Sequence, residues 1–334
     1  MSSSTPLVPV PAGGNAGAVR SAEIELPDVR MHIYRPHEPV VARVSKTEIC
    51  TAKKAAGFVR HMEFDVTGTN LVGQVRPGQS IGVIAPGQDE RGRAHAVRLY
   101  SVASPSAGED GEGKIISTTV KRTIDEDRET HKLFLGVASN HLCDLQVGDE
   151  VRLSGPNGKR FLVPARVEEH DYVFFATGTG IAPFRGMAMD LLRSGGKGSK
   201  VALVMGSPYT TDLMYDREFC KLAGEHKNFT YLTAISREKQ DDGQGRMYVQ
   251  DRLISHREQL GEMLASPRTL VYICGLAGME IGIFQNMAKV LPESAFEQYV
   301  AVDPGVRPAV ETWDRKMLNK QIKATRRVFL EVYA

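Results

Sequence analysis

The sequence lacks the features that define several protein classes. Its 334 residues include only four cysteines (Cys50, Cys143, Cys220 and Cys274), scattered without the paired spacing of zinc or iron–sulfur ligands. No apolar run approaches the ~18 residues that a membrane-spanning helix needs. A net charge of +2 gives no global reason to expect nucleic acid. We therefore expect reduced thiols in a cytoplasmic setting, with no bound metal, membrane span or nucleic-acid partner.

The chain divides into a tail and two domains. Met1–Arg20 is rich in Ser, Pro, Gly and Ala and has no apolar signal core, and we expect residues 1–39 to form a flexible N-terminal tail. Residues 40–166 carry six short strand-like runs with turn clusters such as Pro77-Gly78 between them, which favours an antiparallel barrel or sandwich. The runs are Val40–Cys50, Val59–Val66, Ser80–Ile84, Val97–Val102, Ile115–Val120 and Glu150–Leu153.

Residues 167–334 show a different pattern, in which strand-like and helical stretches alternate. This alternation predicts an α/β domain with a parallel sheet covered by helices on both faces. The expected strands are Tyr172–Phe175, Val201–Met205, Phe229–Ala234 and Leu270–Cys274, and the expected helices are Ala182–Leu192, Glu218–Glu225, Gln250–Leu264 and Met279–Leu291.

A glycine turn follows the first of these strands. Gly178 and Gly180 permit a turn that other residues resist, and Pro183 suits the first turn of a helix. Strand, turn and helix start together are typical of a phosphate cradle, although an ordinary structural turn explains the turn alone about equally well.

A polar cluster ends one of the barrel strands. Alternation places Arg98 and Tyr100 on one face, and Leu99 and Ser101 on the other. An arginine suits a pyrophosphate, a tyrosine can lie on a ring system, and a serine hydroxyl can reach a ring nitrogen. An ordinary strand with one solvated arginine is the alternative.

Longer motifs occur in one order along the chain. They read Arg98-Leu99-Tyr100-Ser101, Val120-Lys121-Arg122, Gly136-Val137-Ala138-Ser139-Asn140, Ser154-Gly155-Pro156-Asn157-Gly158-Lys159, Thr177-Gly178-Thr179-Gly180-Ile181-Ala182-Pro183-Phe184-Arg185, Ser236-Arg237-Glu238, Met247-Tyr248-Val249-Gln250, Cys274-Gly275-Leu276-Ala277-Gly278-Met279-Glu280 and Val332-Tyr333. From about Val40 to Tyr333 the chain resembles the plant-type ferredoxin–NADP⁺ reductases. The resemblance implies an antiparallel β-barrel FAD-binding domain followed by an α/β parallel-sheet NADP(H)-binding domain, with the flavin at the interface.

The resemblance also implies roles for single residues. It implies that Ser101 lies near flavin N5, that the Cys274 thiol borders the nicotinamide, and that Glu280 lies beside the flavin as a proton-handling group. Tyr333 would stack on the flavin face opposite to Tyr100. The cofactor-binding residues that it implies are Arg98, Leu99, Tyr100, Ser101, Val120, Lys121, Val137, Ala138, Ser139, Thr179, Gly180, Ser236, Arg237, Arg246, Tyr248, Gln250, Gly275, Leu276 and Tyr333.

A second polar group indicates which nicotinamide cofactor is used. Ser236, Arg237, Arg246 and Tyr248 offer guanidinium and hydroxyl donors, which suit a compact dianion such as a 2′-phosphate. NADP(H) is therefore predicted over NAD(H). One departure from the family leaves a contact unassigned: Thr123-Ile124-Asp125 stands where plastid proteins have a tyrosine that stacks on the FAD adenine.

The sequence thus predicts an enzyme, an FAD-dependent oxidoreductase that exchanges electrons between NADPH and a one-electron carrier protein, ferredoxin or flavodoxin. One alternative is the reductase component of an oxygenase system with a dedicated electron-transfer subunit. Another is a non-catalytic flavin-binding subunit for docking or sensing, against which the intact set of Ser101, Cys274 and Glu280 argues.

Positive charge is concentrated in residues 314–327. Six basic residues (Arg315, Lys316, Lys320, Lys323, Arg326 and Arg327) stand against one acid, Asp314, which gives this segment a net charge of +5. We expect a basic helix that steers an acidic carrier toward the flavin. A solvated helix face explains the run about as well.

Overall fold

The computed structural model describes residues 23–193 and 198–333. Most of the predicted flexible tail over residues 1–39 therefore lies outside the described residues. The described part of that segment is held by backbone hydrogen bonds, in which Ala165 donates to Glu25 and His32 donates to Pro156, both at 2.9 Å. Residues 23–39 thus lie against the body of the protein.

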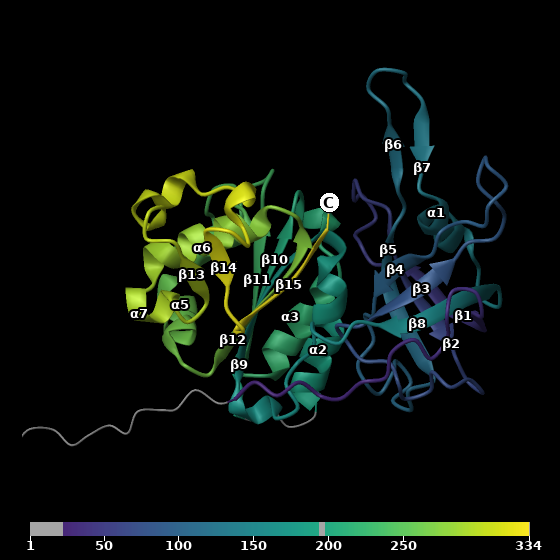
Figure 1. Ribbon diagram of the computed structural model, residues 1–334, viewed down its shortest axis with the longest axis horizontal. Coiled ribbons are helices and arrows are strands. Elements are labelled where there is room, and N and C mark those ends of the chain that lie inside the picture. The colour runs from purple at the N-terminus through teal and green to yellow at the C-terminus, as the bar shows by residue number, and fades with distance from the viewer. Residues whose placement is uncertain (1–22, 194–197, 334) are drawn as a thin grey trace, which may run out of the picture.

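The first half of the chain forms a six-stranded antiparallel sheet (Figure 1). Its strands, in spatial order, are β4 (Arg98–Ser101), β3 (Ser80–Ile84), β8 (Glu150–Asn157), β1 (Val40–Ile49), β2 (Val59–Asp65) and β5 (Ile115–Lys121). An antiparallel bridge between Val102 and Thr118 joins the two edges, so the sheet closes into a barrel. All six predicted strands are confirmed, with ends shifted by a few residues.

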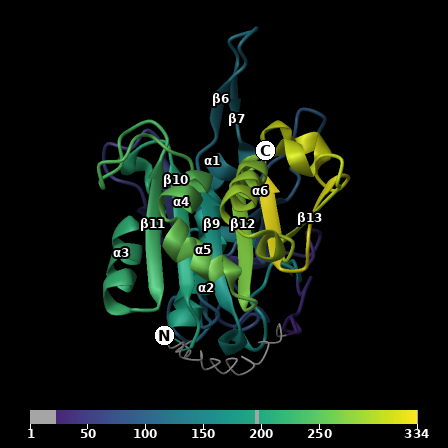
Figure 2. The same cartoon turned by 90° about the vertical axis from the view of Figure 1, so that its left-hand side faces the viewer.

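A hairpin that the sequence analysis did not predict projects from the barrel (Figures 1 and 2). Its strands are β6 (Ile124–Glu126) and β7 (Leu133–Leu135), and the short helix α1 (Val137–Asp144) follows. Each strand has only three residues, and two of those in β6 are acidic, so neither strand shows a recognisable hydrophobic period.

The second half of the chain forms a five-stranded parallel sheet. Its spatial order is β11 (Phe229–Ile235), β10 (Val201–Ser207), β9 (Asp171–Thr177), β12 (Thr269–Leu276) and β15 (Val328–Tyr333). The four predicted strands are confirmed. The fifth, β15, was not predicted and pairs in parallel with β12, where Cys274 lies opposite Glu331.

Helices cover both faces of the parallel sheet, as predicted (Figure 2). One face carries α2 (Ile181–Arg193) and α3 (Asp216–Glu225), and the other carries α4 (Arg252–Ser255), α5 (Arg257–Ala265), α6 (Met279–Val290) and α7 (Glu293–Phe296). The single helix predicted over 250–264 is wrong, because the chain leaves helical geometry at His256 between α4 and α5. No helix in the described ranges is long and apolar enough to cross a membrane.

Short elements complete the described chain. They are the strands β13 (Val300–Val302) and β14 (Ile322–Ala324) and the 3₁₀ turns η1 (Val167–Glu169), η2 (Gly178–Gly180), η3 (Thr210–Asp212), η4 (Val249–Asp251), η5 (Arg307–Thr312) and η6 (Arg315–Met317).

The barrel and the parallel sheet share one hydrophobic cluster. Phe161, which follows the last barrel strand, packs against Phe184 of α2 and Tyr272 of β12, with ring centroids 5.9 and 5.5 Å apart. Val59 of β2 belongs to the same cluster. The two halves are therefore packed against each other through the α2 face of the parallel sheet.

Candidate functional site

The parallel sheet ends in a glycine cradle at its carboxyl edge. Strand β9 is followed by the turn η2 and then by α2, and it lies between β10 and β12, where the strand order reverses and ligands usually bind. A side chain at Gly180 would overlap the Cys274 carbonyl, and one at Gly275 would overlap the Thr177 hydroxyl. Both glycines are needed for the close approach of η2 and β12.

A cavity of about 450 Å³ opens beside this cradle. Predicted cofactor-binding residues from distant parts of the sequence line it: Lys121, Thr179, Ser236, Tyr248, Gln250, Leu276 and Tyr333. Lys121 comes from the barrel and all the others come from the parallel-sheet half. The cavity is concave and lined by both polar and apolar side chains, which suits a nucleotide.

The predicted 2′-phosphate residues approach one another through the backbone. Met247 donates a 3.0 Å hydrogen bond to the Ile235 carbonyl, which brings residues 246–248 beside Ser236 and Arg237. The structure therefore brings two segments of this group together.

Arg237 offers its guanidinium to solvent. It lies over the Tyr209 ring, 5.6 Å from the centroid, and hydrogen bonding to the Tyr209 hydroxyl raises the pKa of Arg237. The neighbouring Glu238 carboxylate accepts a 2.8 Å hydrogen bond from the Thr210 backbone at the start of η3. The Glu238 carboxylate is thus hydrogen-bonded within the protein, and the exposed Arg237 guanidinium is the group that can bind an anionic ligand.

A second cavity, of about 350 Å³, lies on the barrel side. Its lining includes the predicted residues Arg98, Tyr100, Val137, Ala138 and Ser139. Because Arg98 and Tyr100 line the same cavity, their side chains share one face of β4, as the alternation predicted.

The donors in this barrel cavity fit a flavin dinucleotide. Ser139 lies in the first turn of α1, where its hydroxyl donates to the Gly136 carbonyl at 3.1 Å and accepts from the Thr123 N–H at 3.2 Å. A serine so fixed, the backbone N–H groups of a first helical turn and the exposed Arg98 suit a pyrophosphate. The partly buried Tyr100 supplies a ring face.

An aromatic side chain that the sequence analysis missed lines the same cavity. Phe134 of β7 is 63% exposed although it lies on a short hairpin strand. Its ring and Arg98 line one cavity, so an aromatic face is available there to a ligand. No sequence signal identified it, because the hairpin itself was not predicted.

Several predicted cofactor-binding residues are not among those that line these two cavities: Leu99, Ser101, Val120, Gly180, Arg237, Arg246 and Gly275. Val120 is fully buried in the barrel core, so its side chain lines neither cavity, and its part in cofactor binding stays a prediction. Leu99 is 57% exposed and points away from Arg98 and Tyr100.

The proposed catalytic side chains lie near the meeting point of the two halves. Cys274 is buried at the end of β12, and burial raises the pKa of its thiol well above the ordinary value. Tyr333 is hydrogen-bonded through its hydroxyl to the Thr179 hydroxyl at 2.8 Å, and partial desolvation of this 39% exposed residue raises its pKa to about 12. Ser101 is half-buried at the end of β4. The thiol and the phenol are therefore both protonated at neutral pH.

Glu280 has structural partners of its own. It is buried in the first turn of α6, where one carboxylate oxygen accepts from the Gly278 N–H at 2.7 Å. The other lies 3.6 Å from Nε of Arg315. These contacts are those of a helix-start carboxylate with a cationic neighbour.

The structure offers another carboxylate near Cys274. Glu331 of β15 lies opposite Cys274 in the parallel ladder, and its Oε2 is buried with no hydrogen-bond partner. Burial raises its pKa to about 7. Buried carboxyl groups with pKa values near neutrality are typical of proton-handling sites. Its position two residues before Tyr333 was the available sequence signal.

The basic segment does not form the expected helix. Residues 314–327 contain the turn η6 and the short strand β14, so the predicted helical face is wrong. Arg327 is buried and donates to the carbonyl groups of Pro267 and Thr269. It ties β15 to the loop before β12 and does not belong to a docking surface. The remaining basic residues are spread over several turns and one short strand.

The sequence is similar to a known domain family and to several known proteins. The oxidoreductase NAD-binding domain family matches residues 174–284. The chain is 38% identical to a ferredoxin–NADP reductase of Spirulina sp over 266 residues, which cover 78% of this chain and 90% of that protein. It is 34% identical to the chloroplastic root isozyme 2 of ferredoxin–NADP reductase from Arabidopsis thaliana, over 96% of this chain and 81% of that protein.

A solved structure shows the same fold. The ferredoxin–NADP⁺ reductase from Plasmodium falciparum matches with a TM-score of 0.67 and 19% identity, over 90% of this chain and 99% of that one.

Proposed function

The chain belongs to the plant-type ferredoxin–NADP⁺ reductase family, and we propose that it is an FAD-dependent enzyme that exchanges electrons between NADPH and ferredoxin. The observation that carries this proposal is that Lys121, on a barrel strand, lines the nucleotide cavity of the parallel sheet. A nucleotide bound at the parallel sheet therefore lies against the barrel that would hold the flavin.

We propose that residues 40–166 form the FAD-binding domain and residues 167–334 the NADP(H)-binding domain. Arg98 and the first turn of α1 would hold the FAD phosphates, and Tyr100 would lie on the flavin ring. Phe134 lines the same cavity and supplies the aromatic face for adenine that the sequence analysis left unassigned. When bound, FAD accepts a hydride from NADPH and passes electrons on singly.

The residues at the meeting point orient the reactants and hold protons. Ser101 would place its hydroxyl near flavin N5, and the protonated Cys274 would border the nicotinamide. Tyr333 lies at the edge of the nucleotide cavity and is tied to Thr179, so it would have to move for the nicotinamide to enter. Of the acids Glu331 and Glu280, Glu331 is the better candidate for proton handling, because Glu280 is engaged by Gly278 and Arg315.

The proposed nicotinamide cofactor is NADP(H). Arg237 is exposed above Tyr209, Ser236 and Tyr248 line the neighbouring cavity, and Arg246 is exposed in the adjoining segment. Guanidinium groups and hydroxyls in this position favour a 2′-phosphate.

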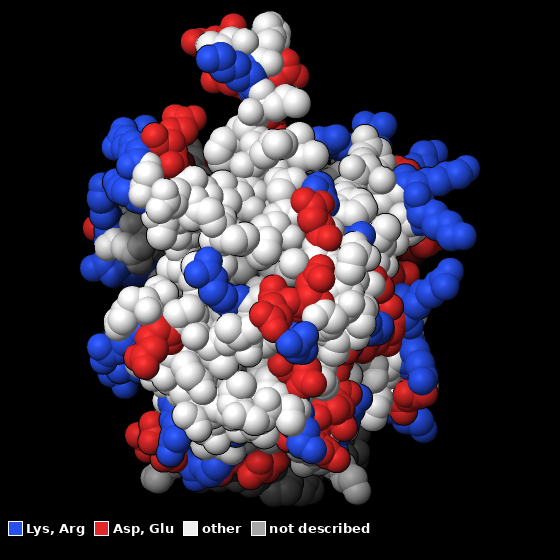
Figure 3. Space-filling model, turned by 90° about the vertical axis from the view of Figure 1, so that its right-hand side faces the viewer, with Lys and Arg blue, Asp and Glu red and all other residues white. Residues whose placement is uncertain are grey.

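Ferredoxin is the proposed carrier because the relatives described above are ferredoxin–NADP reductases. This favours ferredoxin over a dedicated oxygenase subunit, and flavodoxin is a carrier of the same class. The barrel face that points away from the parallel sheet carries charged side chains of both signs, across its middle as well as at its margin, with uncharged surface between them (Figure 3). We therefore expect the carrier to dock elsewhere, near the junction of the two halves.

The proposal is tested by purifying the protein and measuring its flavin. We expect a yellow protein with one FAD per chain that reduces ferricyanide with NADPH. A colourless protein that fails to take up added FAD would contradict the proposal. A yellow protein without NADPH-dependent ferricyanide reduction would point to the non-catalytic alternative.

A further inference from the structure

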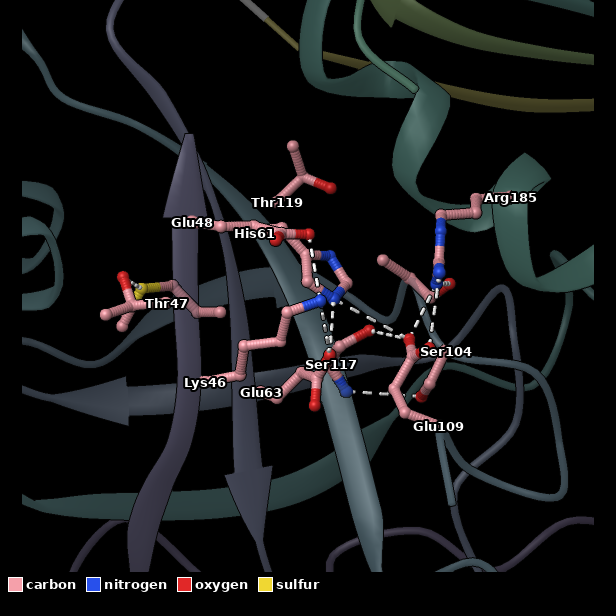
Figure 4. Close-up of polar contacts among 12 residues, drawn as sticks. Lys46, Thr47, Glu48, His61, Glu63, Ser104, Glu109, Ser117, Thr119 and Arg185 are labelled. Carbon is pink, nitrogen blue, oxygen red and sulfur yellow. Dashed lines mark hydrogen bonds and ion pairs between the residues drawn. The ribbon is translucent and has the colours of Figure 1, made fainter. Parts of the chain in front are cut away.

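Helix α2 connects the glycine cradle to the barrel. Its N-terminus continues the cradle, and Arg185, four residues after Ile181, reaches toward the barrel (Figure 4). Two guanidinium nitrogens donate to the two carboxylate oxygens of Glu109, at 2.6 and 3.2 Å. The same group donates to the Ala103 carbonyl at 3.1 Å. Arg185 thus binds the barrel segment that begins two residues after Ser101.

The Glu109–Arg185 pair is buried and held on both sides. The two side chains are 13% and 9% exposed. Glu109 also accepts a 2.7 Å hydrogen bond from the Ser117 hydroxyl of β5, and Arg185 donates to Glu218 of α3 at 2.8 Å. A bidentate arginine–carboxylate ion pair of this kind fixes the orientation of α2 relative to the barrel segment that contains Glu109.

Other contacts keep the same barrel segment along α2. A side chain at Gly186 would overlap the Ser104 carbonyl, so glycine is required for this approach. The Asp190 carboxylate accepts from the Ser106 backbone at 3.0 Å and from its hydroxyl at 2.5 Å. Residues 103–109 therefore run beside α2 over more than one helical turn.

A tyrosine forms a second connection between the halves. Tyr215, at the start of α3, lies 2.9 Å from Nδ1 of His61 and 2.6 Å from the Thr119 hydroxyl through its own hydroxyl. The Arg185 guanidinium lies over its ring, 5.2 Å from the centroid. Arg185 thus contacts Glu109 of the barrel half and Glu218 and Tyr215 of the parallel-sheet half.

The polar cluster around His61 is an ion-pair network. His61, Glu63 and Glu109 have the ligand types of a metal site and lie close together. However, Glu109 is paired with Arg185, and Glu63 lies 3.5 Å from the Lys46 ammonium. Cations of the chain itself already neutralise both carboxylates, which favours salt bridges over a bound metal ion.

We infer that the Glu109–Arg185 pair is a positioning device that sets the distance between the nicotinamide cradle and the flavin. The inference rests on the proposed function. Arg185 is continuous with Thr179 through the start of α2, and Ala103 and Glu109 are continuous with Ser101. A shift of about 1 Å between reacting groups can slow a reaction roughly 100-fold. A rigid contact at this point therefore affects the hydride-transfer rate directly.

The test compares Glu109→Gln with Glu63→Gln in the FAD-loaded protein. Both changes remove one charge from the same cluster, but Glu63 contacts only barrel residues. Stopped-flow reduction by NADPH separates the limiting rate of flavin reduction from the NADPH dissociation constant. We expect Glu109→Gln to lower the limiting rate roughly 10- to 100-fold and to leave the dissociation constant close to that of the wild type. Glu63→Gln should match the wild type in both.

Hydrogen–deuterium exchange supplies a readout that does not depend on turnover. In Glu109→Gln, amide exchange should rise in residues 103–109 and in α2, with or without NADPH, whereas Glu63→Gln should leave it unchanged. A wild-type limiting rate or unchanged exchange in Glu109→Gln would overturn the inference.

A second variant is tested in case Glu109→Gln does not bind FAD. Arg185→Lys keeps the positive charge but cannot form the bidentate ion pair with Glu109, and we expect the same fall in the limiting rate of flavin reduction. Loss of FAD in both variants would mean that the pair serves folding, which also overturns the positioning role. A wild-type protein that binds FAD but is not reduced by NADPH would contradict the proposed function. Equal rates in wild type and variants would contradict only the positioning role.

Discussion

The parallel sheet and the barrel build their binding surfaces from different parts of the chain. At the parallel sheet, the cradle is made by backbone, and Gly180 and Gly275 allow two loops to approach where any side chain would collide. At the barrel, side chains on β4 and α1, among them Arg98, Tyr100 and Ser139, form the cavity wall. Substitutions of the cradle glycines should therefore lower the free energy of unfolding, whereas substitutions at the barrel cavity should lower the affinity for FAD.

The largest effect is expected from the cradle. Gly275→Ala should lower the free energy of unfolding by about 3–5 kcal/mol, because Gly275 has a φ of 147° and a methyl group there would overlap Thr177. Gly178→Ala is the matched control: its φ is 55°, but no atom lies within 4 Å of the added carbon, so the cost should be about 1 kcal/mol. Urea denaturation measures both. Equal losses in the two variants would remove the steric basis of the comparison.

Glu331 is a side chain at the parallel sheet whose effect should depend on pH. Burial raises its pKa from 4.5 to about 7, so the folded protein keeps a proton that the unfolded chain loses as the pH rises through this interval. Stability should therefore fall between these pH values, by at most about 3 kcal/mol, and stay lower above them.

Glu331→Gln should remove this loss, because an amide does not ionise. The check is the free energy of unfolding measured on both sides of the interval, in the wild type and in the variant. Glu280→Gln, at the other buried carboxylate, is the comparison variant and should retain the pH-dependent loss. An identical pH dependence in wild type and Glu331→Gln would show that Glu331 is ionised in the folded protein.

Cofactor preference should depend on a side chain beside the cradle. Arg237→Ala should weaken NADPH binding by about 1.5–3 kcal/mol, roughly one to two decades in the dissociation constant, because a charge-assisted contact to the 2′-phosphate is lost. NADH binding should barely change. Lys239→Ala removes an exposed cation from the same loop and serves as the control. If Arg237→Ala weakens both cofactors equally, Arg237 does not contact the 2′-phosphate.

The smallest effect is expected from the barrel hairpin. Phe134→Ala should weaken FAD binding by about 1–2 kcal/mol through loss of stacking on adenine. Leu133→Ala, on the other face of the same strand, should leave FAD binding unchanged. Binding of FMN, which has no adenine, should be equal in wild type and Phe134→Ala. A loss of FMN affinity as large as the loss of FAD affinity would place Phe134 at the flavin ring.

Buried strands with a clear pattern were predicted well from the sequence. The runs that became β9, β10 and β12 are continuous and apolar because helices cover both faces of the sheet. The hairpin strand β6 was missed, since three residues with two acids carry no period. The break at His256 lies inside an otherwise helical pattern, and the expected basic helix was wrong because charge alone does not define secondary structure.

The sequence motifs contain most of the residues that the structure brings to the two cavities, such as Arg98 and Tyr248, whereas tertiary contacts decided the rest. Val120 is of a residue type common in strands, and nothing in the sequence shows that its side chain faces the barrel core. Glu331 was missed because its significance comes from burial beside Cys274, which depends on the pairing of two strands far apart in sequence. The Glu109–Arg185 contact likewise joins residues that no local pattern relates.

The central claim is that one site exchanges electrons between NADPH and ferredoxin. The most direct measurement mixes the FAD-loaded protein with NADPH, a plant-type ferredoxin and cytochrome c without oxygen and follows the flavin and cytochrome absorbances. With cytochrome c present to reoxidise ferredoxin, we expect the flavin to be reduced first and two cytochrome c molecules to be reduced through ferredoxin for each NADPH oxidised. Flavin that NADPH does not reduce, or cytochrome c reduction that ferredoxin does not increase, would contradict the account.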